Sequence, residues 1–444
     1  MSTLNNLSAK ISQGTAKIAV LGLGYVGLPL AAAFAKKYKV IGFDVNEEKL
    51  RALSENDSYI EGIPNDILRL VRENFTPTND EKMILNCDFK IICVPTPLDE
   101  LKEPELKYVK DACKTISRNL KKEQFIILES TTYPGTTDEV VIPVLERRGL
   151  KAGIDFGVAY SPERIDPGNI RFTVENTPKI VGGINKECTE ISAMLYKSII
   201  NAPVMQVENC RTAEATKIVE NIFREVNIAL VSELALVFEK MNINIWDVID
   251  AASTKPFGFM PFYPGPGIGG HCIPLDPYYL SYKAKKIGQM TRFIELSGEV
   301  NEFMKMHVVN LASTALKNVN KEIRNSTIAV LGLSYKKNID DIRESPSIKV
   351  IEEFAKMDAE IKVYDPFVSM LHTRYGKFTS EKSIEDTLKD VDCAIFMVDH
   401  DAFKNLDLVK YKDLMKHNII IDCKNIFDNI KDYEYYGIGK PQLR

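Results

Sequence analysis

The sequence predicts an α/β protein with two doubly wound, parallel-sheet domains joined by a central helical domain that contains one long helix. Three observations predict this organisation. A strand, a glycine-rich turn and a helix follow one another over residues 17–38. Residues 212–241 contain neither glycine nor proline. The segment that starts at residue 327 repeats the first strand and turn. We therefore expect three domains, at residues 1–205, 206–310 and 311–444.

Composition limits the class of protein. The chain has 444 residues, of which 45% are hydrophobic and 27% charged, as in soluble proteins of two or three domains. Its net charge of −4 gives no electrostatic reason to expect nucleic acid as a partner. No apolar run is long enough for a membrane span, and residues 1–17 lack a signal-peptide core. Eight cysteines without a CxxC pair, and five scattered histidines, predict neither a disulfide framework nor a metal site. We expect a cytoplasmic protein.

The first strand and turn predict a dinucleotide site. Residues 17–23 form a short apolar run, a GxGxxG motif spans residues 22–27, and a helix pattern follows. A second predicted strand, residues 40–44, ends in Asp44, 20 residues beyond Gly24. This context favours a Rossmann-like site over a glycine turn without a ligand.

Each residue of the motif has a predicted role. Gly22 makes the turn, Gly24 admits a pyrophosphate at the helix N-terminus, and Gly27 lets the helix pack on the strand. Tyr25 and Val26 lie between them and would also border the cofactor. Asp44 would accept hydrogen bonds from the adenosine ribose and repel a 2′-phosphate, so NAD is expected rather than NADP.

Further predicted strands at residues 89–94, 125–128 and 156–160 each run into a polar loop. These loops contain Thr96, Thr131, and Glu163 with Arg164. Because ligands bind at the carboxyl ends of strands in open α/β sheets, the threonines could bind the cofactor or a substrate oxygen, and Glu163 could orient a hydroxyl or a water. The alternatives are loop capping for the threonines and an exposed ion pair for Glu163 and Arg164.

The long segment 212–241 predicts one helix of roughly 45 Å, at 1.5 Å per residue. A helix of this length connects domains or packs against a second chain. Lys217 and Asn221 are four residues apart and therefore share a face. In an active site Lys217 could stabilise an oxyanion or exchange protons, whereas in the alternative it is an ordinary solvated lysine. A shorter helix is expected over residues 245–252.

Residues 264–277, PGPGIGGHCIPLDP, predict a loop. Gly269 and Gly270 would let the backbone approach a ligand closely. Cys272 follows them, and Asp276 comes four residues later. We interpret Cys272 as a covalent nucleophile, and the alternative is a packed thiol beside a tight turn.

The repeat in the second half keeps the first glycine of the turn and loses the others. Ser334 and Lys337 stand where the second and third glycines would be, and further strands are expected at residues 363–365, 396–398 and 419–422. Lys336, Lys337 and Arg343 would place cations near a strand end, where they suit a diphosphate. The alternative is a duplicated fold that retains no ligand.

Taken together, these motifs resemble the UDP-glucose/GDP-mannose dehydrogenase family. The resemblance covers nearly the whole chain and keeps the motif order GLGYVG, VPTP, ESTT, SPER, the long-helix lysine and asparagine, GIGGHC and DIRESP. It implies an NAD-binding domain (1–205), a central helical domain with the cysteine loop and the dimer contact (206–310), and a UDP-sugar-binding domain (311–444). It also implies oxidation of a sugar C6 alcohol to a carboxylate with two NAD⁺ per turnover, by a homodimer.

The resemblance also implies residue roles. Cys272 would attack the intermediate aldehyde, giving a thiohemiacetal and then a thioester. Lys217 and Asn221 would hold the oxyanion, and Asp276, with Thr131 and Glu163, would position or activate water. The residues expected at the cofactor are Gly22, Gly24, Tyr25, Val26, Gly27, Asp44, Thr96, Thr131 and Arg343. The residues expected at the sugar nucleotide are Glu163, Arg164, Lys217, Asn221, Gly269, Gly270, Lys336 and Arg343.

Two features refine the expectation. The loop ESTTYPGTT aligns on either Thr131 or Thr132, and we prefer Thr131. The sequences His271-Cys272-Ile273-Pro274 and SPER, and Leu275 before Asp276, resemble the branch that acts on UDP-N-acetylhexosamines. The expected substrate is UDP-GlcNAc, UDP-GalNAc or UDP-ManNAc, and the expected product is a uronic acid for polysaccharide assembly. The alternatives are a UDP-glucose 6-dehydrogenase, a two-electron dehydrogenase and a non-catalytic sensor.

Overall fold

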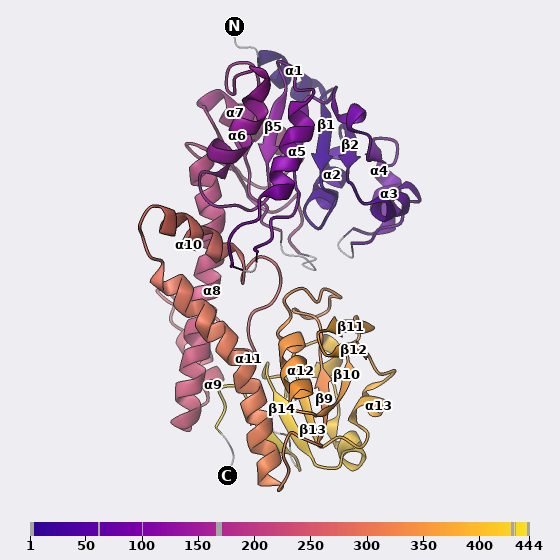
Figure 1. Ribbon diagram of the computed structural model, residues 1–444, viewed down its shortest axis with the longest axis vertical. Coiled ribbons are helices and arrows are strands. Elements are labelled where there is room, and N and C mark those ends of the chain that lie inside the picture. The colour runs from indigo at the N-terminus through magenta and orange to yellow at the C-terminus, as the bar shows by residue number, and fades with distance from the viewer. Residues whose placement is uncertain are drawn as a thin grey trace. The chain divides into compact units, whose positions relative to one another are not determined.

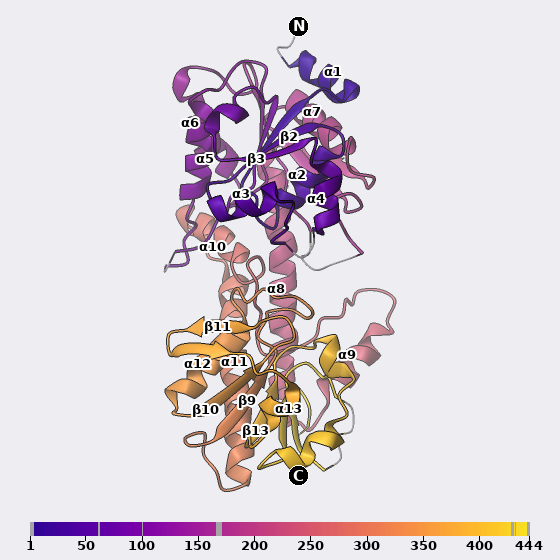
Figure 2. The same ribbon diagram turned by 90° about the vertical axis from the view of Figure 1, so that its right-hand side faces the viewer.

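The computed structural model describes residues 4–60, 63–99, 101–165, 171–427, 430 and 432–441. These residues form two compact units, shown in Figures 1 and 2. The first unit comprises residues 1–220 and 278–290, and the second comprises residues 221–277 and 291–444. Two of the three boundaries fall within helices, α8 (Cys210–Lys240) and α10 (Asp276–Lys286), and the third follows α10.

The first unit contains an eight-stranded sheet among its described residues, in the order β3-β2-β1-β4-β5-β6-β7-β8. The strands from β1 to β6 are parallel, and β7 runs antiparallel to β6. The order 3-2-1-4-5-6 is that of a Rossmann sheet, so the predicted fold class is confirmed. The strands are β1 (Lys17–Leu21), β2 (Lys39–Phe43), β3 (Phe75–Thr78), β4 (Phe89–Ile92), β5 (Phe125–Leu128), β6 (Gly157–Tyr160), β7 (Lys179–Gly183) and β8 (Val204–Gln206).

Helices cover both faces of this sheet, as Figure 2 shows with α5 and α6 on one side and α2 and α7 on the other. The cause is visible in β1, where Ile18 and Val20 belong to one buried core and Ala19 and Leu21 to another. A strand buried on both faces needs apolar residues at every position. The helices are α1 (Asn5–Gln13), α2 (Gly27–Ala35), α3 (Glu47–Ser54), α4 (Asn65–Val71), α5 (Lys107–Ser117), α6 (Ile142–Leu145) and α7 (Lys186–Lys197), with single turns at Glu81–Ile84, Thr137–Val141 and Glu146–Arg148.

The second unit contains a five-stranded parallel sheet in the order β10-β9-β13-β14-β15 and a separate hairpin of β11 and β12. Its strands are β9 (Thr327–Leu331), β10 (Glu360–Tyr364), β11 (Met370–Thr373), β12 (Gly376–Thr379), β13 (Cys393–Phe396), β14 (Ile419–Asp422) and β15 (Glu434–Gly437). The predicted repeat of the first fold is therefore present.

Helices also cover both faces of the second sheet. Helices α11 and α12 contribute to the core that holds Ile328 and Val330, while α13 and α14 pack on Ala329 and Leu331. The helices are α9 (Ile245–Ser253), α11 (Arg292–Asn318), α12 (Pro346–Lys356), α13 (Ile384–Leu388) and α14 (Asp401–Lys404), with a 3₁₀ segment at Leu408–Leu414. No helix in the described ranges is both long enough and apolar enough to cross a membrane.

The loop predicted over residues 264–277 is two residues too long. Asp276 begins α10 and Pro277 is its second residue. Proline fits there because the first turn of a helix does not use its backbone N–H groups. The prediction placed Asp276 in a loop, whereas the structure places it at a helix N-terminus.

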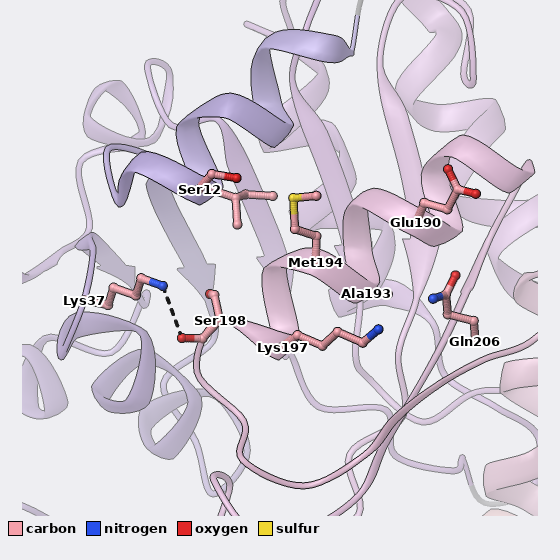
Figure 3. A pocket seen from close by; sticks show the side chains of 9 residues that line it. Ser12, Lys37, Glu190, Ala193, Met194, Lys197, Ser198 and Gln206 are labelled. Atoms are coloured by element: carbon pink, nitrogen blue, oxygen red, sulfur yellow. Dashed lines mark hydrogen bonds between the residues drawn. The ribbon is translucent and has the colours of Figure 1, made fainter.

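A surface cavity of about 370 Å³ lies at the edge of the first unit (Figure 3). It is bordered by α1, α7, Lys37 before β2, and Gln206 at the end of β8. Because β8 runs opposite to β1–β6, these residues mark the amino-terminal edge of the parallel strands. Ligands of such sheets bind at the other edge, and none of the predicted site residues borders this cavity.

Candidate active site

The glycine turn after β1 has the geometry that the motif predicts. Gly22 has φ of +92°, and a Cβ there would lie 2.7 Å from the carbonyl oxygen of Cys93, which follows the neighbouring strand β4. A Cβ on Gly27 would lie 1.8 Å from the carbonyl oxygen of Gly22, so only glycine allows α2 to start this close to the turn. A Cβ on Gly24 would meet nothing within 4 Å, which leaves room for a pyrophosphate.

The acid at the end of β2 is held at this turn. One carboxylate oxygen of Asp44 accepts a hydrogen bond from the backbone N–H of Leu23 (2.8 Å), and the other accepts one from Asn46 (3.0 Å). Each oxygen keeps a lone pair for a ribose hydroxyl. Tyr25 is 37% exposed and Val26 precedes α2. The residues present fit a bound dinucleotide.

The two threonine loops are joined to each other. The hydroxyl of Thr96 donates to the carbonyl oxygen of Thr131 at 2.8 Å. Thr131 is half-buried, whereas Thr132 is fully buried and its hydroxyl has no hydrogen-bond partner within the described part of the chain. The accessible side chain is therefore that of Thr131.

A buried glutamate on α8 holds the end of the second threonine loop. The carboxylate of Glu214 accepts hydrogen bonds from the N–H groups of Gly135 (2.5 Å) and Thr137 (2.8 Å) and from the Thr137 hydroxyl (2.7 Å). Burial raises the pKa of Glu214 to about 7. The role of Glu214 could not be predicted from local sequence, because nothing local links position 214 to position 135.

Glu163 lies within a buried network rather than in an exposed ion pair. One of its oxygens accepts from the N–H groups of Arg164 (2.7 Å) and Ile165 (2.6 Å), and the other lies 3.3 Å from the ammonium of Lys179. Lys179 also contacts Glu129 at 3.0 Å. The guanidinium of Arg164 pairs instead with Glu220 on α8, at 2.7 Å.

Lys217 and Asn221 lie one turn apart on α8, and both are buried, so Lys217 is not a solvated lysine. The boundary between the units falls between them, with Lys217 in the first unit and Asn221 in the second.

Three predicted residues meet in the second unit. The side-chain amide of Asn221 donates to the carboxylate of Asp276 at 2.5 Å, and both side chains are buried. The backbone N–H of Asp276 donates to the carbonyl oxygen of Cys272 at 2.9 Å. Cys272 therefore stands one helical turn before the start of α10, where the helix dipole favours an anion such as a thiolate.

Cys272 differs from the other seven cysteines. All eight fall within the described residues, and Cys272 is exposed while the others are buried. Burial raises the pKa of the Cys113 thiol to about 12 and that of Cys188 to about 11. Because a thiolate is the nucleophile, Cys272 is the residue suited to covalent chemistry.

The glycines before Cys272 have a structural reason that sequence analysis did not give. A Cβ on Gly269 would lie 2.6 Å from Cβ of Tyr335, and one on Gly270 would lie 2.8 Å from the Tyr335 ring. Gly270 also has φ of +84°, and its N–H donates to the carbonyl oxygen of Arg343. The cysteine loop is thus packed on the turn after β9, which the repeat of the first fold provides.

Two of the cations predicted to bind a diphosphate are Lys336 and Arg343. Lys336 is half-buried, and the guanidinium of Arg343 forms a bidentate pair with Asp341, at 2.5 to 3.0 Å. The acid of the repeat, Asp365, accepts from the Leu333 N–H as Asp44 does from Leu23, but it also contacts the buried ring of His400 at 3.1 Å. The turn after β9 therefore keeps the geometry of the turn after β1. Its acid, Asp365, contacts His400 within the second unit.

The structure thus joins Thr96 with Thr131 in the first unit and Cys272, Asp276 and Asn221 in the second. Gly269, Gly270 and the Arg343 backbone meet within the second unit. Four buried residues that hold these loops and side chains in place were not predicted from the sequence. They are Glu129, Lys179, Tyr196 and Glu214.

Comparison with known proteins agrees with this geometry. The NAD binding domain of the UDP-glucose/GDP-mannose dehydrogenase family matches residues 16–200, its central domain matches residues 211–303, and its UDP binding domain matches residues 329–429. The chain belongs to this family. It is an NAD-dependent dehydrogenase with a UDP-binding domain.

Relatives match over almost their whole length. The chain is 38% identical to protein CapL of Staphylococcus aureus over 93% of this chain and 95% of that protein. It is 37% identical to the UDP-N-acetyl-D-glucosamine 6-dehydrogenase of Pseudomonas aeruginosa, over 94% and 98%. The structure of UDP-D-ManNAc dehydrogenase from Pyrococcus horikoshii has a TM-score of 0.89 at 34% identity and covers 96% of this chain and 100% of that chain.

Proposed function

We propose that this dehydrogenase oxidises the C6 alcohol of a UDP-N-acetylhexosamine to a carboxylate in two two-electron steps. The observation that carries the proposal is the placement of Cys272, an exposed thiol one helical turn from a buried Asp276 that Asn221 holds. A simple alcohol dehydrogenase has no need of a nucleophile, and neither does a sensor.

NAD⁺, when bound, would accept one hydride in each oxidation, so each sugar uses two NAD⁺. The first oxidation removes a hydride from C6 and a proton from its hydroxyl and gives the C6 aldehyde. The thiolate of Cys272 then adds to the aldehyde carbon, and the resulting thiohemiacetal anion loses a hydride from C6 to become a thioester. Water adds to the thioester carbon and releases its two protons to solvent, the carbon–sulfur bond breaks, and the carboxylate and the Cys272 thiolate are released.

The other residues serve these steps. Lys217 and Asn221 stabilise the oxyanion of the tetrahedral states, since both are buried donors on one face of α8. Asp276, with Thr131 and Glu163, positions or activates water. Lys336 binds the sugar nucleotide, and Arg343 binds either the cofactor or the sugar nucleotide.

The sugar is proposed from similarity. Two of the three relatives are named as dehydrogenases of UDP-N-acetyl-D-glucosamine and UDP-D-ManNAc, and the SPER and HCIP sequences resemble that branch. The test is the kcat/KM of the purified enzyme for UDP-GlcNAc, UDP-GalNAc, UDP-ManNAc and UDP-glucose. We expect one N-acetylhexosamine to be preferred. A preference for UDP-glucose would support the alternative, a UDP-glucose 6-dehydrogenase that makes UDP-glucuronate.

We further propose a homodimer that forms through α8. Val219, Phe223, Leu230 and Val237 are 45% to 58% exposed and recur every four or seven residues, which places them on one face of the helix. The domain organisation proposed with it is an NAD-binding domain over residues 1–205, a dimerising helical domain over 206–310 and a UDP-sugar-binding domain over 311–444. A cytoplasmic location, supported by the seven buried cysteines, which form no disulfide in the described part of the chain, and a role of the uronic acid in polysaccharide assembly complete the proposal.

A further inference from the structure

A buried charge cluster lies behind Glu163, at the carboxyl edge of the first sheet. Glu129 follows β5 and is 0% exposed, Glu163 follows β6 and is 8% exposed, and Lys179 opens β7 and is 5% exposed. Tyr196 of α7 is fully buried and donates its hydroxyl to Glu129. Two carboxylates thus share one ammonium group out of contact with bulk water.

The sheet itself brings these groups together. The antiparallel register of β6 and β7 pairs Tyr160 with Gly182, and continuing that register by three residues places Glu163 opposite Lys179. The ammonium of Lys179 is then 3.3 Å from one oxygen of Glu163 and 3.0 Å from Glu129. Lys179 is therefore fixed on one side by Glu129 and reaches Glu163 on the other.

Glu163 is held from two directions. Lys179 contacts one carboxylate oxygen, and the N–H groups of Arg164 and Ile165 donate to the other. A carboxylate with both oxygens engaged in this way has one orientation, which is what a group that positions water requires.

Fold stability alone is a poor reason for the cluster. Burying charges costs desolvation, and a buried ion pair is often no more stable than apolar residues of the same size. Here the cost is larger, because Glu129 and Glu163 share the ammonium group of Lys179. Burial raises the pKa of Glu129 in spite of the Lys179 charge, and the two carboxylates keep the pKa of Lys179 raised against the effect of burial.

We propose that Lys179 is a positioning residue for Glu163 and that Glu129 in turn positions Lys179. The inference rests on the proposed function, in which Glu163 positions or activates the water that hydrolyses the thioester. Lys179 orients the Glu163 carboxylate, and Glu129 together with Tyr196 holds the lysine in place.

The titratable groups that face this cluster come from five elements. They are Cys93 after β4, Glu129 after β5, Glu163 after β6, Lys179 on β7 and Tyr196 on α7. The thiol of Cys93 and the phenol of Tyr196 have raised pKa values, chiefly through burial, so they stay neutral over the working range of pH. The charged groups of this cluster that face Glu163 are therefore Lys179 and Glu129.

The test is the pH profile of kcat in four variants. Lys179→Met removes the cation beside Glu163, so the acid limb should move up by about 1 to 3 pH units. Glu129→Gln removes the carboxylate that fixes Lys179, so the limb should also move up, by less than in Lys179→Met, and Lys179→Arg should keep the wild-type profile. The matched control is Lys90→Met. Lys90 is a buried lysine of β4 in the same sheet whose ammonium donates to the carbonyl oxygen of Cys87 at 2.9 Å, and its loss should leave the acid limb in place.

Crystal structures of Lys179→Met and Lys179→Arg give a readout that does not depend on turnover. We expect the Glu163 carboxylate to leave its position in the first variant and to keep it in the second. If Lys179→Met does not fold, the double variant Glu129→Gln/Lys179→Met is measured instead, because it removes one negative and one positive charge together. An unmoved carboxylate and unmoved acid limbs in an active enzyme would overturn the inference. If the Glu163 carboxylate is displaced in Lys179→Met but the wild-type enzyme oxidises no UDP-sugar, Lys179 still positions Glu163, and it is the proposed function that is wrong.

Discussion

Glu214 should make the first unit less stable as the pH rises. Its buried carboxylate accepts three hydrogen bonds from Gly135 and Thr137, and burial raises its pKa from 4.5 to about 7. A carboxyl group with a raised folded-state pKa contributes stability that is fully present below its unfolded pKa. That stability is lost as the pH rises through the folded value. The window is therefore from about pH 4.5 to about pH 7.

The size of the effect follows from the two pKa values. One pKa unit corresponds to about 1.4 kcal/mol, so ionisation of Glu214 should cost about 3 kcal/mol between pH 4 and pH 8. In Glu214→Gln nothing titrates, but the amide nitrogen cannot accept from the Gly135 N–H. That lost bond should cost about 1 to 3 kcal/mol at pH 5. The variant should thus be less stable than wild type at pH 5 and should lose that disadvantage by pH 8.

Urea unfolding measured from pH 4.5 to pH 8.5 tests this. The only tryptophan, Trp246, lies in the second unit, so its fluorescence follows that unit, while far-UV circular dichroism follows both. The effect should appear in the transition that Trp246 does not report. Glu190→Gln, which changes an exposed glutamate of α7 in the same unit, is the control and should retain the wild-type slope.

The reasoning would be refuted by a Glu214→Gln protein whose stability falls with pH as steeply as that of wild type. In that case Glu214 is ionised throughout the range, and the loop from Gly135 to Thr137 binds a permanent carboxylate. A difference in unfolding free energy between wild type and Glu214→Gln that appears only in the transition reported by Trp246 would contradict the account as well.

Four further variants test the glycine turn, Asn221 and the exposed face of α8. Gly24→Ala should fold, since its Cβ meets nothing within 4 Å, but should raise the KM for NAD about tenfold through one lost bond of about 1.5 kcal/mol. Gly27→Ala should fail to form the turn, because its Cβ would lie 1.8 Å from Gly22, and equal thermal stability of the two variants would contradict this. Asn221→Ala should lower kcat by about 10²- to 10³-fold with a small change in Tm, and a kcat within about threefold of wild type would exclude an oxyanion role. Leu230→Glu should convert the dimer to a monomer in light scattering while Ile154→Glu, an exposed change away from α8, should not, and a Leu230→Glu dimer would place the interface elsewhere.

Local sequence patterns predicted the parts of the fold that local physics decides. The buried strand from Lys17, the glycine turn and Asp44 lie where their pattern placed them, because each follows from residue type and close spacing. Two boundaries were less accurate. The predicted strand at residues 396–398 is β13, Cys393–Phe396, and the predicted cysteine loop extends two residues into α10. Apolar runs and prolines locate an element without fixing its ends.

The missing parts of the site depend on contacts between distant segments. Glu129, Lys179 and Tyr196 come from three separate stretches, and only the pairing of β6 with β7 brings Lys179 to Glu163. Charged residues next to buried strands were the available signal, since such residues need a partner. The close approach of Gly269 and Gly270 to Tyr335 could not be read from either segment alone, because it depends on how the cysteine loop packs on the second sheet.

The most direct test of the account is the number of NADH molecules formed per UDP-sugar consumed, together with the mass of the Cys272 peptide after quenching. Wild type should form about two NADH per sugar and show a covalent sugar adduct on Cys272. Cys272→Ala should lose both, while Cys113→Ala, which removes a buried thiol of α5, should keep both. One NADH per sugar in wild type, with an active Cys272→Ala variant and no adduct, would contradict the thioester mechanism and show a two-electron alcohol dehydrogenase.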